Sequence, residues 1–220
     1  MGATPETSVR GRISLAAVEA TLRRTQRVLG SALDRDPLDD RVLDNLLAGY
    51  TYVDGLVTAG IDPFTLGNLR HLLELNYLVL CGASPERRLA YARHLEANER
   101  RFYGEGAGGI RDVVEWVAAH PGAPETDRAA GVYSMMLAQP QLFIEGNHRT
   151  GALAMAYVLA RAGRPPFVLS PENAAAYFEI SAALRDTGKH SPAASFRLSA
   201  LVARLAGILA ADVDRRHLIA

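Results

Sequence analysis

An acid, a glycine, an amide, an imidazole and a guanidinium stand in five consecutive positions, from Glu145 to Arg149. They follow a segment with helical character that ends near Ala138, and they lead into a long apolar segment, Gly151 to Ala160. A connection between two helices usually needs only about two to eight residues with no particular chemistry. The run is therefore a candidate binding or catalytic site.

These residue types suit a phosphate group and a magnesium ion. If a helix starts near Thr150, the backbone amides of residues 146–150 lie at its N-terminus, where unpaired N–H groups and the helix dipole favour an anion. Arg149 adds a planar donor fork for phosphate. Glu145 is a lone carboxylate, and Mg²⁺ is commonly held by one or two carboxylates plus water and substrate phosphate. The structural alternative is that Asn147 satisfies turn backbone groups and that Glu145 and Arg149 form a surface ion pair.

The segment from Phe143 to Thr150 resembles the Fic family signature, His-x-Phe-x-Asp/Glu-Gly-Asn-Gly-Arg-x-x-Arg. In that family the signature lies in a loop between two helices of an all-α domain, and the proteins transfer AMP (AMPylation) or another phosphate-containing group onto a protein hydroxyl. The resemblance implies that Glu145 binds Mg²⁺, that Gly146 and Asn147 shape an anion hole, and that Arg149 holds phosphate. It also implies a nucleotide or related donor and a target protein that presents a Ser, Thr or Tyr hydroxyl.

Three positions depart from the signature. The histidine that serves the family as general base is Gln141 here, and an amide cannot take a proton at neutral pH. The second glycine is His148 and the second arginine is Ala152. Both positions handle the outer phosphates in the family, so a different phosphate donor, or none, becomes plausible. His148 is a candidate substitute base because its ordinary pKa of about 6.5 suits proton transfer; alternatively, it donates to phosphate or caps the helix.

Two functions from different classes follow. The first is a Mg²⁺-dependent nucleotidyltransferase or related transferase with altered or reduced base chemistry, and the retained Glu145 favours it. The second is a catalytically degenerate binding or regulatory module for a phosphorylated ligand or a protein partner, and Gln141 favours that one.

The elements that must position the run are helices. Apolar residues recur at helical intervals in four segments: 15–33, 42–57, 65–80 and 196–213. A serine followed by proline, which is a helix start signal, occurs at Ser84, Ser170 and Ser191. The spacing predicts one all-α domain over residues 1–220, and the resemblance implies that it is Fic-like, with a small β-hairpin flap, the motif loop at 139–150 and the helices within 14–60 as a possible appendage.

Strand signals are sparse. Phe167 to Leu169 is one candidate for a short extended piece. Arg101 to Ile110 is another, and its glycine-rich part, Tyr103 to Ile110, stands where Fic proteins carry a β-hairpin flap that aligns the target segment. The alternative for this glycine-rich part is a flexible connector between helices.

Composition limits the remaining possibilities. The 220 residues are 49% apolar and 22% charged, which is typical of a globular domain. The 24 Lys and Arg balance 24 Asp and Glu, so no basic excess favours nucleic acid. The longest apolar stretch, 151–160, is too short to span a bilayer, and the first dozen residues lack a signal-peptide core. A single cysteine, Cys81, excludes an internal disulfide. We expect a cytoplasmic protein without nucleic-acid or membrane partners.

Overall fold

The computed structural model describes residues 11–30, 38–190 and 192–219, and helices cover about 70% of them. The helices are α1 (Leu15–Leu29), α2 (Asp40–Ala59), α3 (Arg70–Cys81), α4 (Pro85–Ala90), α5 (Ala92–Phe102), α6 (Ile110–Ala119), α7 (Glu125–Leu137), α8 (Asn147–Arg161), α9 (Ala174–Arg185) and α10 (Pro192–Ala211), with 3-10 turns η2 (Leu66–Asn68) and η3 (Arg215–His217). Two short strands, β1 (Arg12–Ile13) and β2 (Leu218–Ile219), form one antiparallel pair. The predicted all-α class with a small antiparallel β element is confirmed.

Local capping explains where several helices begin and end. Asp39 accepts a hydrogen bond from the Val42 amide at the start of α2, and Gly60 ends that helix in the left-handed region at φ 70°. Ser84 accepts from the Arg87 amide at the start of α4, as predicted. The start expected at Ser170 comes later, at Ala174, because residues 171–173 form a turn first. The expected Leu33 and Ser191 lie outside the described residues.

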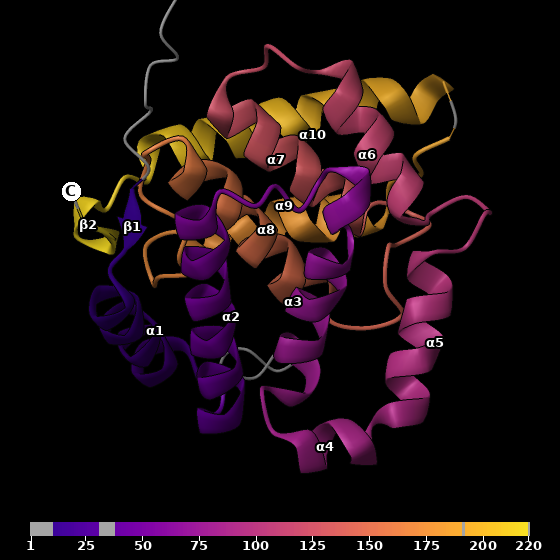
Figure 1. Cartoon of the computed structure of the whole chain (residues 1–220). Helices are drawn as coiled ribbons and strands as arrows, with labels where there is room; N and C mark the ends of the chain where they lie inside the picture. Colours follow the sequence, from indigo (N-terminus) through magenta and orange to yellow (C-terminus); the bar gives the residue numbers. More distant parts are fainter. Residues whose placement is uncertain (1–10, 31–37, 191, 220) are drawn as a thin grey trace, which may run out of the picture.

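Helix α8 runs through the middle of the bundle and packs against α2, α3 and α7 (Figure 1). Eleven of its 15 residues are buried, which is the pattern of a helix enclosed on all sides. Close packing depends on small residues: a Cβ on Gly151 would lie 2.7 Å from the Tyr133 ring. The core therefore fixes the axis of the helix whose first turn follows the predicted motif.

The N-terminal helices contribute to the same core. Val18 and Leu22 of α1 and Leu43 and Val53 of α2 are buried in the large hydrophobic cluster that also contains α8. The first strand, β1, pairs with β2 at the other end of the chain (Figure 1). The segment 14–60, expected as a possible appendage, thus shares a core with the motif helix.

The expected hairpin flap within Arg101 to Ile110 is wrong, because these residues contain no strand. They form the turn that joins α5 to α6, as in the connector alternative. The Gly104 amide donates to Arg101 O, the Gly108 amide donates to Asp112 at 2.9 Å, and Gly108 has a φ of 91°. Local bonds of this kind close a compact turn, so no backbone groups align for strand pairing.

The candidate strand Phe167 to Leu169 also has no regular secondary structure. Side chains rather than a partner strand satisfy its carbonyl groups: Tyr50 bonds to Phe167, Asn173 to Val168 and Thr25 to Leu169. Among the helices of the described residues, none combines the length and apolar character needed to cross a membrane.

Candidate functional site

The predicted motif lies in a loop between α7 and α8, as the sequence indicates. Helix α8 begins at Asn147, three residues before the predicted start at Thr150, and its first backbone bond joins the Thr150 amide to Gly146 O at 2.9 Å. Gly146 is the N-cap residue in the left-handed region, at φ 81°. A Cβ there would lie 2.8 Å from Asn76 Nδ2, so both backbone conformation and space require glycine.

Asn147 holds the loop in shape. Its side-chain oxygen accepts from the Phe143 amide, and its side-chain nitrogen donates to Phe143 O, both at 2.8 Å. Phe143 is buried and stacks on Phe102 with the ring planes 14° apart. The structural interpretation of Asn147 as a turn-forming side chain is therefore confirmed, and the amides of the first turn of α8 are held in a fixed position.

Two buried asparagines support the same loop, and sequence reasoning missed their role. Asn98 of α5 accepts from the Ile144 amide at 2.8 Å and donates to Asn76 of α3 at 3.2 Å. Asn76 donates to Glu145 O at 3.0 Å and to Thr150 Oγ1 at 3.1 Å. The available signal was an amide within an otherwise apolar helix face, since buried polar groups need partners.

Glu145, the predicted metal ligand, is exposed at the rim of the loop. Its carboxylate lies 3.2 Å from His94 Nε2, and 58% of its side chain is accessible to solvent. The surface ion pair with Arg149 is not formed. His94 and Asn98 share one face of α5, and both contact this loop. No cluster of three or more acidic, histidine or cysteine side chains suited to a metal occurs in the described part of the chain.

His148 and Arg149 line a pocket of about 50 Å³. The rest of this pocket, which we call the apolar pocket, is Leu22, Leu38, Val42, Leu46, Tyr50, Ala152, Phe167, Leu169, Tyr177 and Phe178. His148 Nδ1 lies 3.3 Å from the Tyr133 hydroxyl. The half-buried Arg149 side chain makes no ion pair or hydrogen bond with any described residue.

Gln141, at the position of the family's general base, is bonded on both sides. Its side-chain oxygen accepts from Asn147 at 3.3 Å, and its backbone oxygen accepts from the Arg101 guanidinium at 2.7 Å. The two predicted catalytic side chains are therefore held separately: Gln141 bonds within the loop, whereas His148 contacts Tyr133 of α7.

A cluster of ionisable groups secures the start of the loop. Asp112 Oδ2 lies 2.9 Å from the Gly108 amide, 3.4 Å from Lys189 Nζ and 3.3 Å from His190 Nε2. Burial lowers the pKa of Lys189 to about 8, although Asp112 opposes that shift. The Lys189 amide also donates to Gln139 O at 2.8 Å. The cluster thus joins the glycine-rich turn to the first residue of the loop.

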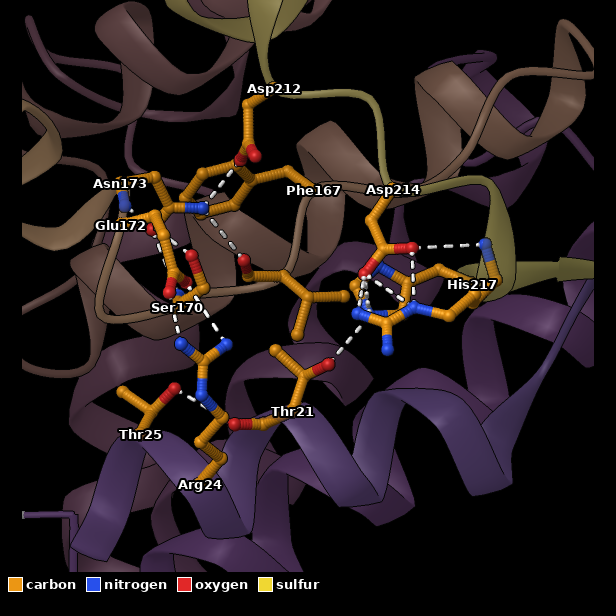
Figure 2. Close-up of polar contacts among 12 residues, drawn as sticks. Thr21, Arg24, Thr25, Phe167, Ser170, Glu172, Asn173, Asp212, Asp214 and His217 are labelled. Atoms are coloured by element: carbon orange, nitrogen blue, oxygen red, sulfur yellow. Dashed lines mark hydrogen bonds and ion pairs between the residues drawn. The ribbon is translucent and has the colours of Figure 1, made fainter. Parts of the chain in front are cut away.

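A second cavity, which we call the polar pocket, measures about 380 Å³. Its lining residues come from α1, the segment 166–172 and the C-terminal segment 211–217 (Figure 2). Its strongest charges are paired within the chain, Arg24 with Glu172 and Arg216 with Asp214. His217 hydrogen-bonds to Thr21 at 2.8 Å. The arginines of the polar pocket are therefore paired within the chain, whereas Arg149 has no partner among the described residues.

In comparisons with known proteins, no family model and no curated protein matches this chain.

Proposed function

We propose that this protein is a Mg²⁺-dependent transferase similar to the Fic proteins, which moves a nucleotidyl or other phosphate-containing group onto a protein hydroxyl with altered base chemistry. The observation that carries the proposal is the first turn of α8. Gly146 and Asn147 fix its amides at the loop, Glu145 lies at one rim with its carboxylate exposed, and Arg149 has no partner among the described residues. Such a turn, with its dipole, favours a bound phosphate.

The residues at the loop fit a magnesium ion that takes a single ligand from the protein. Glu145 offers a single exposed carboxylate, which suits Mg²⁺ that keeps water and phosphate oxygens as its remaining ligands. Bound there, Mg²⁺ would neutralise charge on the transferred phosphate group. The His94 side chain would orient Glu145 in the absence of metal, since the two lie 3.2 Å apart.

Positioning and charge stabilisation are the contributions that this chain's residues make to transfer. Arg149 and the α8 amides would hold the phosphate group and stabilise charge that develops on it. Neither of the two candidate residues is placed to act as the missing general base. Gln141 bonds within the loop, and His148 bonds to Tyr133. We place this activity in the cytoplasm as part of the same proposal, since Cys81 is a buried free thiol.

One observation favours the second candidate, a binding module without turnover. The side chain at the base position, Gln141, is used to brace Asn147, and its carbonyl is bonded by Arg101. These bonds stabilise the loop, and a loop stabilised in this way would still hold a phosphorylated ligand or partner.

Calorimetry with ATP and Mg²⁺ tests the phosphate–metal site. Glu145→Ala should abolish the Mg²⁺ dependence of binding, because the one carboxylate at the loop is lost. Arg149→Ala should weaken binding with or without metal. Glu125→Ala removes an exposed acid at the far end of α7 and is the matched control. If both site variants bind ATP and other phosphate donors as the parent does, the assignment is wrong.

The enzyme and the binding module differ in their response to Gln141→His. In a site that has only lost its base, the variant should gain about a hundredfold to ten-thousandfold in transfer from labelled ATP. In a site rebuilt for another donor, the variant should gain little, the parent should label target protein from that donor, and His148→Ala should be the more damaging change. Tight ligand binding without labelling by any of the three proteins would reject the enzyme and retain the binding module.

A further inference from the structure

Within the described ranges, no residue supplies a counter-charge to Arg149. Its guanidinium is half-buried, lines the apolar pocket and contacts no carboxylate or carbonyl of the described residues. Every other guanidinium that we have described at the loop or in the polar pocket, those of Arg101, Arg24 and Arg216, has an acceptor. A partly desolvated charge is costly unless it is paired, so the surroundings of Arg149 favour an anion from outside the chain.

The space beside that charge is apolar. Ala152 follows Arg149 by three residues, and both line the pocket, whereas the Fic signature has a second arginine at the position of Ala152. Apart from the His148 ring, the remaining walls are aliphatic and aromatic side chains from α1, Leu38, α2, α9 and the segment 167–169. The Tyr50 hydroxyl is already bonded to Phe167 O and the Tyr177 hydroxyl to His148 O. Among the described residues that line the pocket, Arg149 is the single guanidinium, and the His148 ring already contacts the Tyr133 hydroxyl, so a second phosphate has no second arginine there.

The size of the pocket limits what enters it. Its volume of about 50 Å³ is a third of the roughly 150 Å³ of an apolar cavity that accepts benzene. A group of about two carbon atoms fits, and a ring does not.

We propose that the site takes an organic monophosphate whose ester arm is a short alkyl group. The phosphate binds Arg149 and the α8 amides, and the alkyl group enters the apolar pocket between α2 and α9. This inference rests on the proposed function and names its donor class, an alkyl phosphate in place of a nucleotide. In the transfer, the target hydroxyl oxygen would bond to phosphorus, the bond between phosphorus and the alkyl oxygen would break, and the alcohol would leave with the proton that the target hydroxyl gives up.

The test is calorimetry of the full chain with inorganic phosphate, methyl phosphate, ethyl phosphate, ethanol and ATP, each with and without Mg²⁺. Each methylene that becomes buried contributes about 0.8 kcal/mol, so affinity should rise about fourfold from methyl to ethyl phosphate. Ala152→Leu should abolish this gain while it leaves inorganic phosphate unchanged. Leu46→Ala should enlarge the pocket and extend the gain to propyl phosphate, which provides a second measurement if the first variant does not fold.

The arms of the experiment separate this inference from the proposed function. Mg²⁺-dependent ATP binding without a gain from methyl to ethyl phosphate would keep the transferase proposal and overturn the alkyl donor. A gain that is independent of Mg²⁺ and of Glu145 would support the alkyl phosphate and count against the metal-dependent transferase. Ethanol that binds as tightly as ethyl phosphate, or no binding of any phosphate, would overturn the inference.

Discussion

At the scale of a single residue, Asn147 stabilises the loop that carries the motif. The resemblance implied that this side chain shapes an anion hole. Its side chain bonds both the N–H and the C=O of Phe143, and only 5% of the residue is exposed. Removal of the side chain leaves two backbone groups without partners in a buried place. An unsatisfied buried group costs about 1–3 kcal/mol.

Asn147→Ala should therefore lower the free energy of unfolding by about 2–6 kcal/mol, the cost of two backbone groups left without partners. Urea denaturation measures the change. Glu145→Gln is the matched control from the same loop, because an exposed pair such as that with His94 is worth about 0–1 kcal/mol. An Asn147→Ala protein that unfolds at the urea concentration of the parent would show that water replaces the amide.

At the scale of elements, the start of α6 and the segment after α9 are tied together by one lysine. Lys189 is the only lysine in the sequence, and its side chain is 1% exposed beside Asp112. Burial penalises its charged form and lowers its pKa to about 8, against an ordinary value of 10.5. The unfolded chain thus binds this proton more tightly than the folded chain does. The contribution of Lys189 to stability is full above the unfolded pKa and is lost as the pH falls through about 8.

In protein with ¹³C-labelled lysine, one signal should titrate near pH 8 in the folded state, because the chain has a single lysine. In urea the same signal should titrate near 10.4, as an exposed lysine does. Asp112→Asn should move the folded titration further down, since the favourable charge is removed, and should destabilise the protein more at pH 7 than at pH 10. A folded-state titration above 10 would contradict the burial of the charge.

Elements outside the loop also decide how the motif is presented. Asn76 of α3 bonds to Thr150 in the first turn of α8, and Asn98 and Arg101 of α5 bond to the loop before that turn; the three lie 40 to 74 residues from these partners in the chain. Each is polar within a helix whose other buried residues are mostly apolar. A local pattern shows that such a side chain is buried, but not which loop it meets.

At the scale of the whole molecule, the two ends of the chain close on each other. Ser14 donates its amide to His217 O at 2.9 Å, and the His217 ring bonds to Thr21 within the polar pocket (Figure 2). Burial lowers the pKa of His217 below its ordinary value of 6.5, while Asp214 opposes the shift. Hydrogen bonding from Arg216 lowers the pKa of Asp214 to about 2.

The contact between the two ends of the chain should therefore become weaker as the pH falls. The depressed pKa of His217 gives a stability contribution that is present above pH 6.5 and is lost as the pH falls through the folded value. His217→Gln keeps a hydrogen-bonding group for Thr21 and cannot charge, so its melting temperature should fall less than that of the parent between pH 7 and pH 5. His120→Gln removes an exposed histidine and serves as the control. Parallel curves for the parent and His217→Gln would exclude His217 as the acid-sensitive group.

The sequence by itself determined the helical class, several helix boundaries such as the start at Ser84 and the end at Gly60, and the loop between α7 and α8 that carries Glu145 to Arg149. These features follow from interactions within a few residues, namely apolar spacing, capping side chains and glycine at a left-handed position, so they can be recognised along the chain. The departure at Gln141 was equally visible, because it is a matter of residue type alone.

Only the tertiary structure decided what these residues contact. In the folded chain, Glu145 pairs with His94, and His148 and Arg149 line an apolar pocket. The small β element lies at the chain ends, where Arg12 opposes Ile219, and not in the glycine-rich turn. Contacts of this kind depend on which helix faces pack together and on which distant backbone groups are left to pair. Neither is set by the periodicity of a single segment, because the same apolar stripe can bury itself against several partners.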